Sequence, residues 1–134
     1  MRFSQAVAIA ATLASLFLSG PSAAQHTSPP TPTTRILAIG TINSRVDPAA
    51  VRSILPTEVR ETVKLYLDGK IDQWFSLQDR SGVAFILNVT DPAVARDMLE
   101  KLPLCQAHLM SFDLIPLGPL DPLRQLHGMS AGLP

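Results

Sequence analysis

Apolar runs alternate with amphipathic stretches along the middle of this 134-residue chain. Apolar residues spaced by three and four positions predict helices, whereas short runs rich in Ile, Leu, Val and Phe predict strands. The segments that fit strands are residues 35–42, 70–78, 83–89 and 108–115. The segments that fit helices are residues 48–67 and 91–102. The chain therefore repeats a unit in which a helix follows a strand.

The two expected helices begin with nearly the same sequence. Asp47-Pro48-Ala49-Ala50-Val51-Arg52 returns 44 residues later as Asp91-Pro92-Ala93-Val94-Ala95-Arg96. An aspartate can accept hydrogen bonds from the free amides of a first helical turn, and a proline loses nothing there by lacking an N–H. Both helix starts are thus well marked. Pro56 predicts a break or kink in the first helix, and Asp68-Gly69 predicts its end.

The order of the elements predicts the fold. The turn Asp79-Arg80-Ser81-Gly82 separates two expected strands, which should pair as a hairpin. The order βαββαβ is that of the ferredoxin-like class, an α+β fold in which a four-stranded antiparallel sheet carries two helices on one face. We place this domain at residues 35–123.

Both faces of the expected sheet are apolar. Along the first strand Ile36 and Ala38 point to one face while Leu37 and Ile39 point to the other, and residues 83–89 repeat the pattern. Helices on one side leave the second face without cover. We expect a second copy of the chain to cover it, giving a homodimeric α+β barrel or a larger homo-oligomer. The alternative is a monomer whose own C-terminal tail folds over this face.

The sequence from Pro116 to Leu123 has a proline at every third position, each followed by a leucine. A polyproline helix has three residues per turn, so Leu117, Leu120 and Leu123 would share one edge. We expect a C-terminal arm that leaves the sheet at residue 116 and lies against a neighbouring subunit. Residues 124–134 predict a flexible tail.

Residues 1–24 have the features of a secretory signal peptide, with Arg2 before an apolar core and small residues before a cleavage site after Ala24. The core of 13 residues is shorter than the ~20 residues that span a bilayer. We therefore expect export to the periplasm or the medium, with no membrane attachment after cleavage. Residues 25–34, with three prolines and no large apolar residue, predict a disordered leader.

The charge and the cysteine content limit the classes of partner molecule and the disulfides that the chain can form. Without residues 1–24 the chain has ten basic and eleven acidic side chains, and its Lys and Arg residues are scattered. Nucleic-acid binders usually carry a basic stripe, so DNA and RNA are excluded as partners. The single cysteine, Cys105, has no internal disulfide partner. It is either a reactive or intermolecular thiol or a small buried apolar residue.

The segment from Gly69 through Val89 and on to Leu102-Pro103-Leu104 resembles the hairpin, helix and Leu-Pro-Leu turn of the muconolactone isomerase family. The resemblance covers most of residues 35–120. It implies a small ferredoxin-like chain of the dimeric α+β barrel superfamily. It also implies an enzyme that moves a double bond within a lactone ring and assembles into a large homo-oligomer.

An isomerase of this type needs a base that removes a carbon-bound proton, a donor to the developing enolate, and a wall that excludes water. The catalytic candidates are His108, Tyr66 and Asp72. The substrate-binding candidates are Trp74, Ser76, Arg80 and Asn88. Several have a structural alternative: His108 as a surface histidine, Tyr66 and Trp74 as rings that pack in the core or an interface, and Arg80 as an exposed arginine. Asn88 needs a hydrogen-bond partner if it is buried.

The chain shows no metal or cofactor motif. It contains neither His-Glu-x-x-His nor Cys-x-x-Cys, and its three histidines are far apart. We therefore predict no metal and no cofactor. A haem or a flavin stays open, because barrels of the resembled superfamily hold either without a short motif. His108 would then be the iron ligand.

Two functions remain. The first is an exported, muconolactone isomerase-like protein that acts as an isomerase or lyase on a small cyclic or carboxylated molecule by acid–base catalysis. The second is a non-catalytic module that binds a small ligand or serves assembly. A catalytic pocket should bring at least two polar side chains to one cavity, whereas a cavity filled by Trp74, Phe112 and leucines would favour the second function.

Overall fold

The computed structural model describes residues 30–123. The elements are β1 (Arg35–Ile42), α1 (Pro48–Leu67), β2 (Ile71–Ser76), β3 (Gly82–Leu87), α2 (Pro92–Glu100), α3 (Pro103–Gln106) and β4 (Met110–Leu117). The strands form one antiparallel sheet in the order β2-β3-β1-β4. This confirms the predicted α+β class and the βαββαβ order, with α3 as an additional single turn. The expected signal peptide and the tail 124–134 lie outside the described residues.

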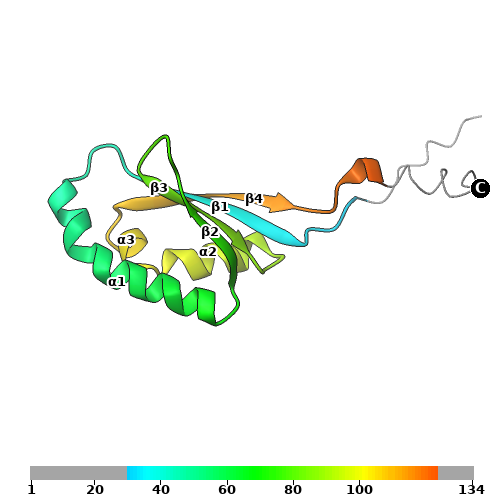
Figure 1. Ribbon diagram of the computed structural model, residues 1–134, viewed down its shortest axis with the longest axis horizontal. Coiled ribbons are helices and arrows are strands. Elements are labelled where there is room, and N and C mark those ends of the chain that lie inside the picture. The colour runs from blue at the N-terminus through cyan, green and yellow to red at the C-terminus, as the bar shows by residue number, and fades with distance from the viewer. Residues whose placement is uncertain (1–29, 124–134) are drawn as a thin grey trace, which may run out of the picture.

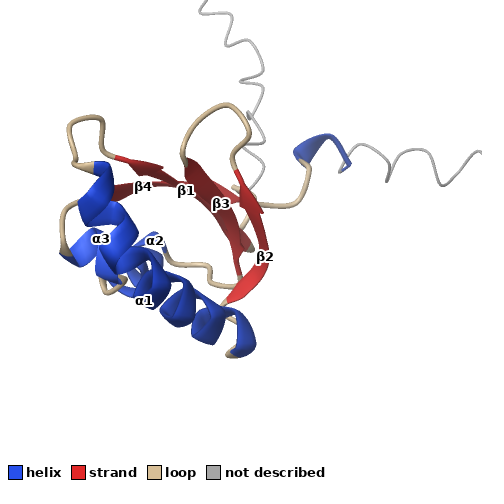
Figure 2. Ribbon diagram, turned by 60° about the vertical axis from the view of Figure 1, so that its left-hand side comes forward, coloured by secondary structure: helices blue, strands red, loops and turns tan. Residues whose placement is uncertain are grey.

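The helices α1, α2 and α3 lie on the same face of the sheet (Figures 1 and 2). The core between them and the sheet consists of Ile36, Ala38, Ile71, Phe85, Leu87, Ala95, Leu99 and Leu102. Phe112 of β4 passes so close to Gly40 of β1 that a Cβ there would lie 2.6 Å from the phenylalanine ring. The glycine therefore makes room for the ring. Val94 of α2 lies outside this core and is exposed.

The sequence-predicted helix starts are confirmed. The Asp47 carboxylate accepts a hydrogen bond from the Ala49 amide at 2.9 Å, and the Asp91 carboxylate accepts one from the Ala93 amide at 2.8 Å. The end of α1 is also as expected. Gly69 adopts a left-handed conformation with φ 72°, and its N–H donates to the carbonyl of Tyr66. This is the glycine-terminated helix end that the sequence favours.

The predicted break at Pro56 is wrong, because α1 runs without interruption from Pro48 to Leu67. The proline removes one hydrogen bond to the carbonyl of Arg52, and the helix axis bends in this part of the chain (Figure 1). The helix packs against α3 and β2 rather than on the central strands. Its single buried residue is Glu58. α1 therefore stands apart from the middle of the sheet, and the space between them is the candidate site described below.

The second face of the sheet is not covered by any described helix or strand (Figure 2). It presents Leu37 and Ile39 of β1, Ile86 of β3 and Ile115 of β4. The strand register places Leu37 between Ile86 and Ile115, and it pairs Ile39 with Ala84 and Asp113. Ile115 is 44% exposed and the other three are half-buried. The pattern of two apolar faces is thus confirmed for the single chain.

The polyproline helix expected from residue 116 is wrong. β4 continues to Leu117, where the Leu117 carbonyl accepts a hydrogen bond from the Thr34 amide, and residues 121–123 form a 3₁₀ turn. This described part of the tail points away from the sheet (Figure 1) and does not cover its open face. The end of the expected leader lies beside it, because Thr31 hydrogen-bonds to Asp121. Local pairing with residues 30–34 thus replaces the extended arm.

Candidate functional site

A hollow of about 330 Å³ lies between α1, the β2–β3 hairpin and α3, and we call it the α1 pocket. The side of α1 that lines it carries Leu55, Glu58, Val59, Thr62 and Val63. These positions recur at intervals of three and four, so they share one helix face. Most of the lining is apolar, and Glu58 is its one ionisable side chain.

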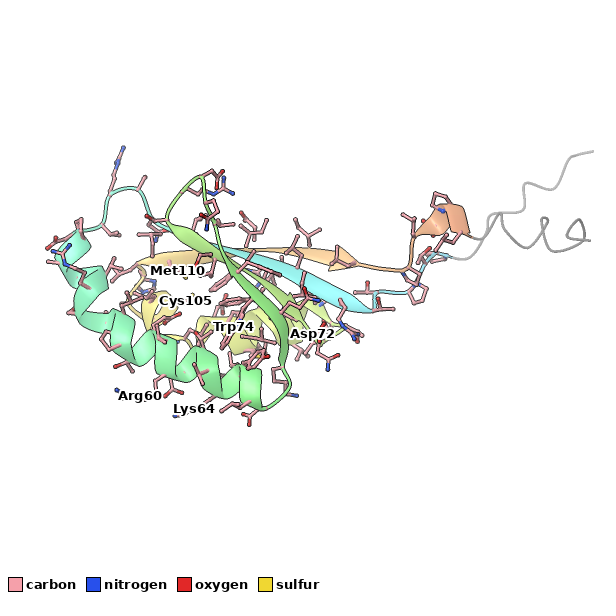
Figure 3. The ribbon with its side chains drawn as sticks, in the orientation of Figure 1. Arg60, Lys64, Asp72, Trp74, Cys105 and Met110 are labelled. Atoms are coloured by element: carbon pink, nitrogen blue, oxygen red, sulfur yellow. The ribbon has the colours of Figure 1, made fainter. Side chains whose placement is uncertain are left out.

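An aromatic pair closes one end of this region. Tyr66 of α1 stacks on Trp74 of β2, with ring centroids 4.2 Å apart and an interplanar angle of 14°. Trp74 also lines the α1 pocket. Figure 3 shows Trp74 between the sheet and α1, whereas Arg60 and Lys64 point away on the outer side of the helix. The inner face of α1 is therefore aromatic and apolar, and its charged residues lie mostly outside.

Glu58 is buried, with 7% of its surface exposed. Its Oε2 accepts a hydrogen bond of 2.8 Å from the backbone N–H of Leu104, in the first turn of α3. That turn has no side-chain cap of its own, so Glu58 supplies the missing acceptor from another element. The second oxygen, Oε1, has no hydrogen bond within residues 30–123. One carboxyl oxygen is thus held by α3, and the Glu58 side chain as a whole lines the cavity.

Burial raises the pKa of the Glu58 carboxyl, and the hydrogen bond from Leu104 lowers it in part. An apolar wall disfavours the charged form, which is the usual reason for a raised carboxyl pKa. A carboxyl of this kind is better matched to proton transfer near neutral pH than an exposed glutamate. Glu58 was not among the sequence candidates. In the sequence it is one of two glutamates on an amphipathic helix, and its partner Leu104 lies 46 residues away.

Cys105, next to Leu104, is half-buried. Burial, followed by the charges of Glu58 and Glu100, raises the pKa of its thiol to about 11. Nucleophilic chemistry requires the thiolate. Since a thiol with this pKa stays protonated at neutral pH, the structure favours the second interpretation of Cys105, a small residue that is partly buried.

Some predicted site residues come together and others do not. Trp74 and Ser76 both line the α1 pocket, and Tyr66 reaches it through its stack on Trp74. Asp72 does not. A β-bulge between Ile71 and Gln73 shifts the register, so that Ile71 and Trp74 face the same side of the sheet and Asp72 is exposed. The bulge therefore interrupts the alternation of side chains along β2 and separates Asp72 from Trp74 and Ser76. Figure 3 shows Asp72 far from Met110, which lies at the other end of the pocket region.

Asn88 and Arg80 have local contacts. The Asn88 side chain donates to the Gly69 carbonyl at 3.2 Å, and its backbone N–H donates to Lys70 at 2.8 Å, so it joins the end of β3 to the turn after α1. Arg80 pairs with Asp79 at 3.2 Å in the exposed hairpin loop. Neither residue lines the α1 pocket. Asn88 therefore satisfies its polar groups within the fold.

His108 lies in the turn between α3 and β4, because β4 begins at Met110 rather than at residue 108. It lines a separate hollow of about 510 Å³ beside α2 and β4, together with Arg96 and Glu100. It is not part of the α1 pocket. Its carbonyl accepts a hydrogen bond of 2.7 Å from the Asn43 side chain. His108 is thus separated from Tyr66 and Trp74, with which it was expected to act.

His108 also has φ 58°, the one positive φ among the described residues other than glycine. The left-handed conformation costs a residue with a Cβ about 1 kcal/mol. We therefore expect His108→Gly to raise the free energy of unfolding by up to about 1 kcal/mol relative to His108→Ala, which keeps the strained backbone and removes the ring. Urea unfolding of the two variants measures this difference. A glycine variant less stable than the alanine variant would contradict it.

Within residues 30–123, no group of three or more His, Cys, Asp or Glu side chains is arranged to hold a metal ion. No helix in that range is long and apolar enough to cross a membrane. Neither a protein-family model nor a curated protein matches the chain. The function must therefore be inferred from the site itself.

Proposed function

We propose that the protein is an exported enzyme of the isomerase or lyase type, which takes a small organic molecule into the α1 pocket and uses Glu58 as its acid–base group. The observation that carries this proposal is a buried carboxyl in an apolar cavity, with one oxygen held by the Leu104 amide and the other free. Buried titratable groups with shifted pKa values are typical of catalytic sites. The muconolactone isomerase-like segments of the sequence agree with this reaction class.

The chemistry is a proton relocation. Glu58 in its ionised form takes a proton from a carbon beside a carbonyl group and returns it to another carbon, so the double bond moves and no proton is gained or lost. Thr62 and Ser76 line the same pocket. The Thr62 hydroxyl donates to the Glu58 carbonyl at 2.9 Å, so the Ser76 hydroxyl is the available donor to the developing enolate oxygen. Trp74 and Val59 are apolar walls of the pocket and both are partly exposed, so the bound ligand itself must displace water from the carbanion.

The alternative is a ligand-binding module with no reaction. It is favoured by the fact that Glu58 also caps α3, which explains its burial without catalysis. Two polar side chains besides Glu58 line the α1 pocket, as a catalytic pocket requires. These two side chains, Thr62 and Ser76, do not belong to the predicted catalytic set of His108, Asp72 and Tyr66. They therefore support a catalytic pocket but not the catalytic residues predicted from the sequence.

Native mass spectrometry of the protein purified from its own exporting host tests for a bound small molecule. We expect one ligand per chain, and we expect Thr62→Phe, which fills the cavity, to remove it. Once the ligand is identified, Glu58→Gln should keep ligand binding and lose at least about a hundredfold in turnover. Glu61→Gln, on the same helix and outside the pocket, is the control. Unchanged turnover in Glu58→Gln would leave the binding module as the function.

The proposal includes a homodimer in which two sheets face each other as an α+β barrel. It is supported by the apolar face of Leu37, Ile39, Ile86 and Ile115, which nothing in residues 30–123 covers. Contiguous exposed apolar surface of this kind usually marks an interface. A closed pair of sheets would shield it from water and leave the α1 pockets, on the opposite faces, open to the solvent.

A further inference from the structure

A second hollow, of about 450 Å³, continues the α1 pocket toward the start of the helix. The two hollows share four lining residues, Leu55, Val83, Leu104 and Met110. We call the combined space the α1 groove. From Arg52 to Thr62 it follows the inner face of the helix for ten residues, which is about 15 Å at 1.5 Å per residue. The groove is therefore longer than a single-ring molecule needs.

The charges of the groove lie apart from each other. Arg52 is the one charged side chain that lines the outer hollow, and Glu58 is the one that lines the inner hollow. The Arg52 side chain makes no ion pair or hydrogen bond within residues 30–123, whereas Arg80 and Lys64 are paired with acids. An unpaired guanidinium at the rim of an apolar groove is suited to bind a carboxylate.

We propose, on the basis of the function proposed above, that the ligand is a free, single-tailed amphiphile with an anionic head at Arg52 and an uncharged apolar body that runs along α1 toward Glu58 and Trp74. The charges of Arg52 and Glu58 determine the direction in which the ligand lies along the groove. A carboxylate at the inner end would meet Glu58 in an apolar cavity, where an unpaired charge is costly to bury. At the exposed rim the anionic head stays largely hydrated and also forms an ion pair with Arg52.

Trp74 gives a direct measurement, because it is the only tryptophan of the chain and it lines the inner hollow. Decanoate, 1-decanol and decyltrimethylammonium have the same apolar tail and do not absorb where tryptophan does. We expect decanoate to change the Trp74 emission and to bind about two- to fivefold more tightly than decyltrimethylammonium, since an exposed ion pair contributes up to about a factor of five. Added salt should weaken decanoate alone.

Arg52→Gln should weaken decanoate binding by about two- to fivefold and leave 1-decanol unchanged, since it removes only the head contact. Arg60→Gln is the matched control, because Arg60 lies on the outer side of the same helix (Figure 3). Equal affinities of decanoate for wild type and Arg52→Gln would overturn the assigned head position. So would a stronger response to the cation, or a response to phosphatidylglycerol vesicles instead of decanoate. If none of the three probes changes the Trp74 emission, and none releases heat when titrated into the protein, the α1 pocket does not bind a ligand. The proposed function is then wrong as well.

Discussion

Replacing Leu37 with lysine is expected to convert the proposed homodimer into a folded monomer. Leu37 lies in the middle of the open sheet face, and its register partners there are Ile86 and Ile115. In a single chain the lysine amine reaches water, so the fold survives. In the dimer the same amine would be buried against apolar side chains without a partner. This costs roughly 3–5 kcal/mol, which corresponds to a loss of more than about a hundredfold in dimer affinity.

Light scattering at micromolar protein concentration measures the change in mass, and circular dichroism checks the fold. Val94→Lys is the matched control, because Val94 is 51% exposed and lies on α2, on the helical side of the sheet. It should keep the mass of the wild type. A wild-type chain that is already monomeric would refute the barrel, and a dimeric Leu37→Lys would show that the interface is elsewhere.

Elements that depend on neighbouring residues were predicted well from the sequence. Both helix starts follow from an aspartate and a proline next to each other, and the end of α1 follows from Gly69, whose missing side chain permits a positive φ. The two apolar faces of β1 follow from its run of consecutive apolar residues, because successive side chains of a strand point to opposite faces. None of these features requires knowledge of distant parts of the chain.

Features that depend on distant contacts were missed. The bulge in β2 is set by its pairing with β3 and turns Asp72 away from Trp74. The tail from 116 pairs with Thr34 instead of forming a polyproline helix, because β1 and β4 extend together. The candidate site shows the same limit. Trp74 and Ser76 were found because aromatic and hydroxyl side chains are conspicuous on a strand, whereas Glu58 is recognisable only once α3 lies beside α1.

Glu58→Ala is expected to lower the free energy of unfolding by about 2–3 kcal/mol. The substitution leaves the buried Leu104 N–H without an acceptor and opens a space beneath the helix. For a domain of this size the loss corresponds to roughly 10 °C or more in Tm, compared at equal protein concentration because a dimer adds its own stability. Glu58→Gln keeps a carbonyl oxygen for the Leu104 amide, so it should stay within about 1 kcal/mol of the wild type.

The glutamine variant also isolates the titration of Glu58. Burial raises the pKa of this carboxyl in the folded chain. At a pH between the ordinary and the raised pKa, the carboxyl is therefore protonated in the folded state and ionised in the unfolded state. The stability of the wild type should therefore fall as the pH rises through that interval. Glu58→Gln lacks this fall, and subtracting its stability curve from that of the wild type removes the titrations that the two proteins share.

Loss of the Glu58 charge should also lower the pKa of Cys105 and speed its reaction with a thiol reagent. Parallel stability curves together with an unchanged thiol rate would mean that Glu58 is solvated rather than enclosed, and a solvated carboxylate has no reason to act as the base of this pocket.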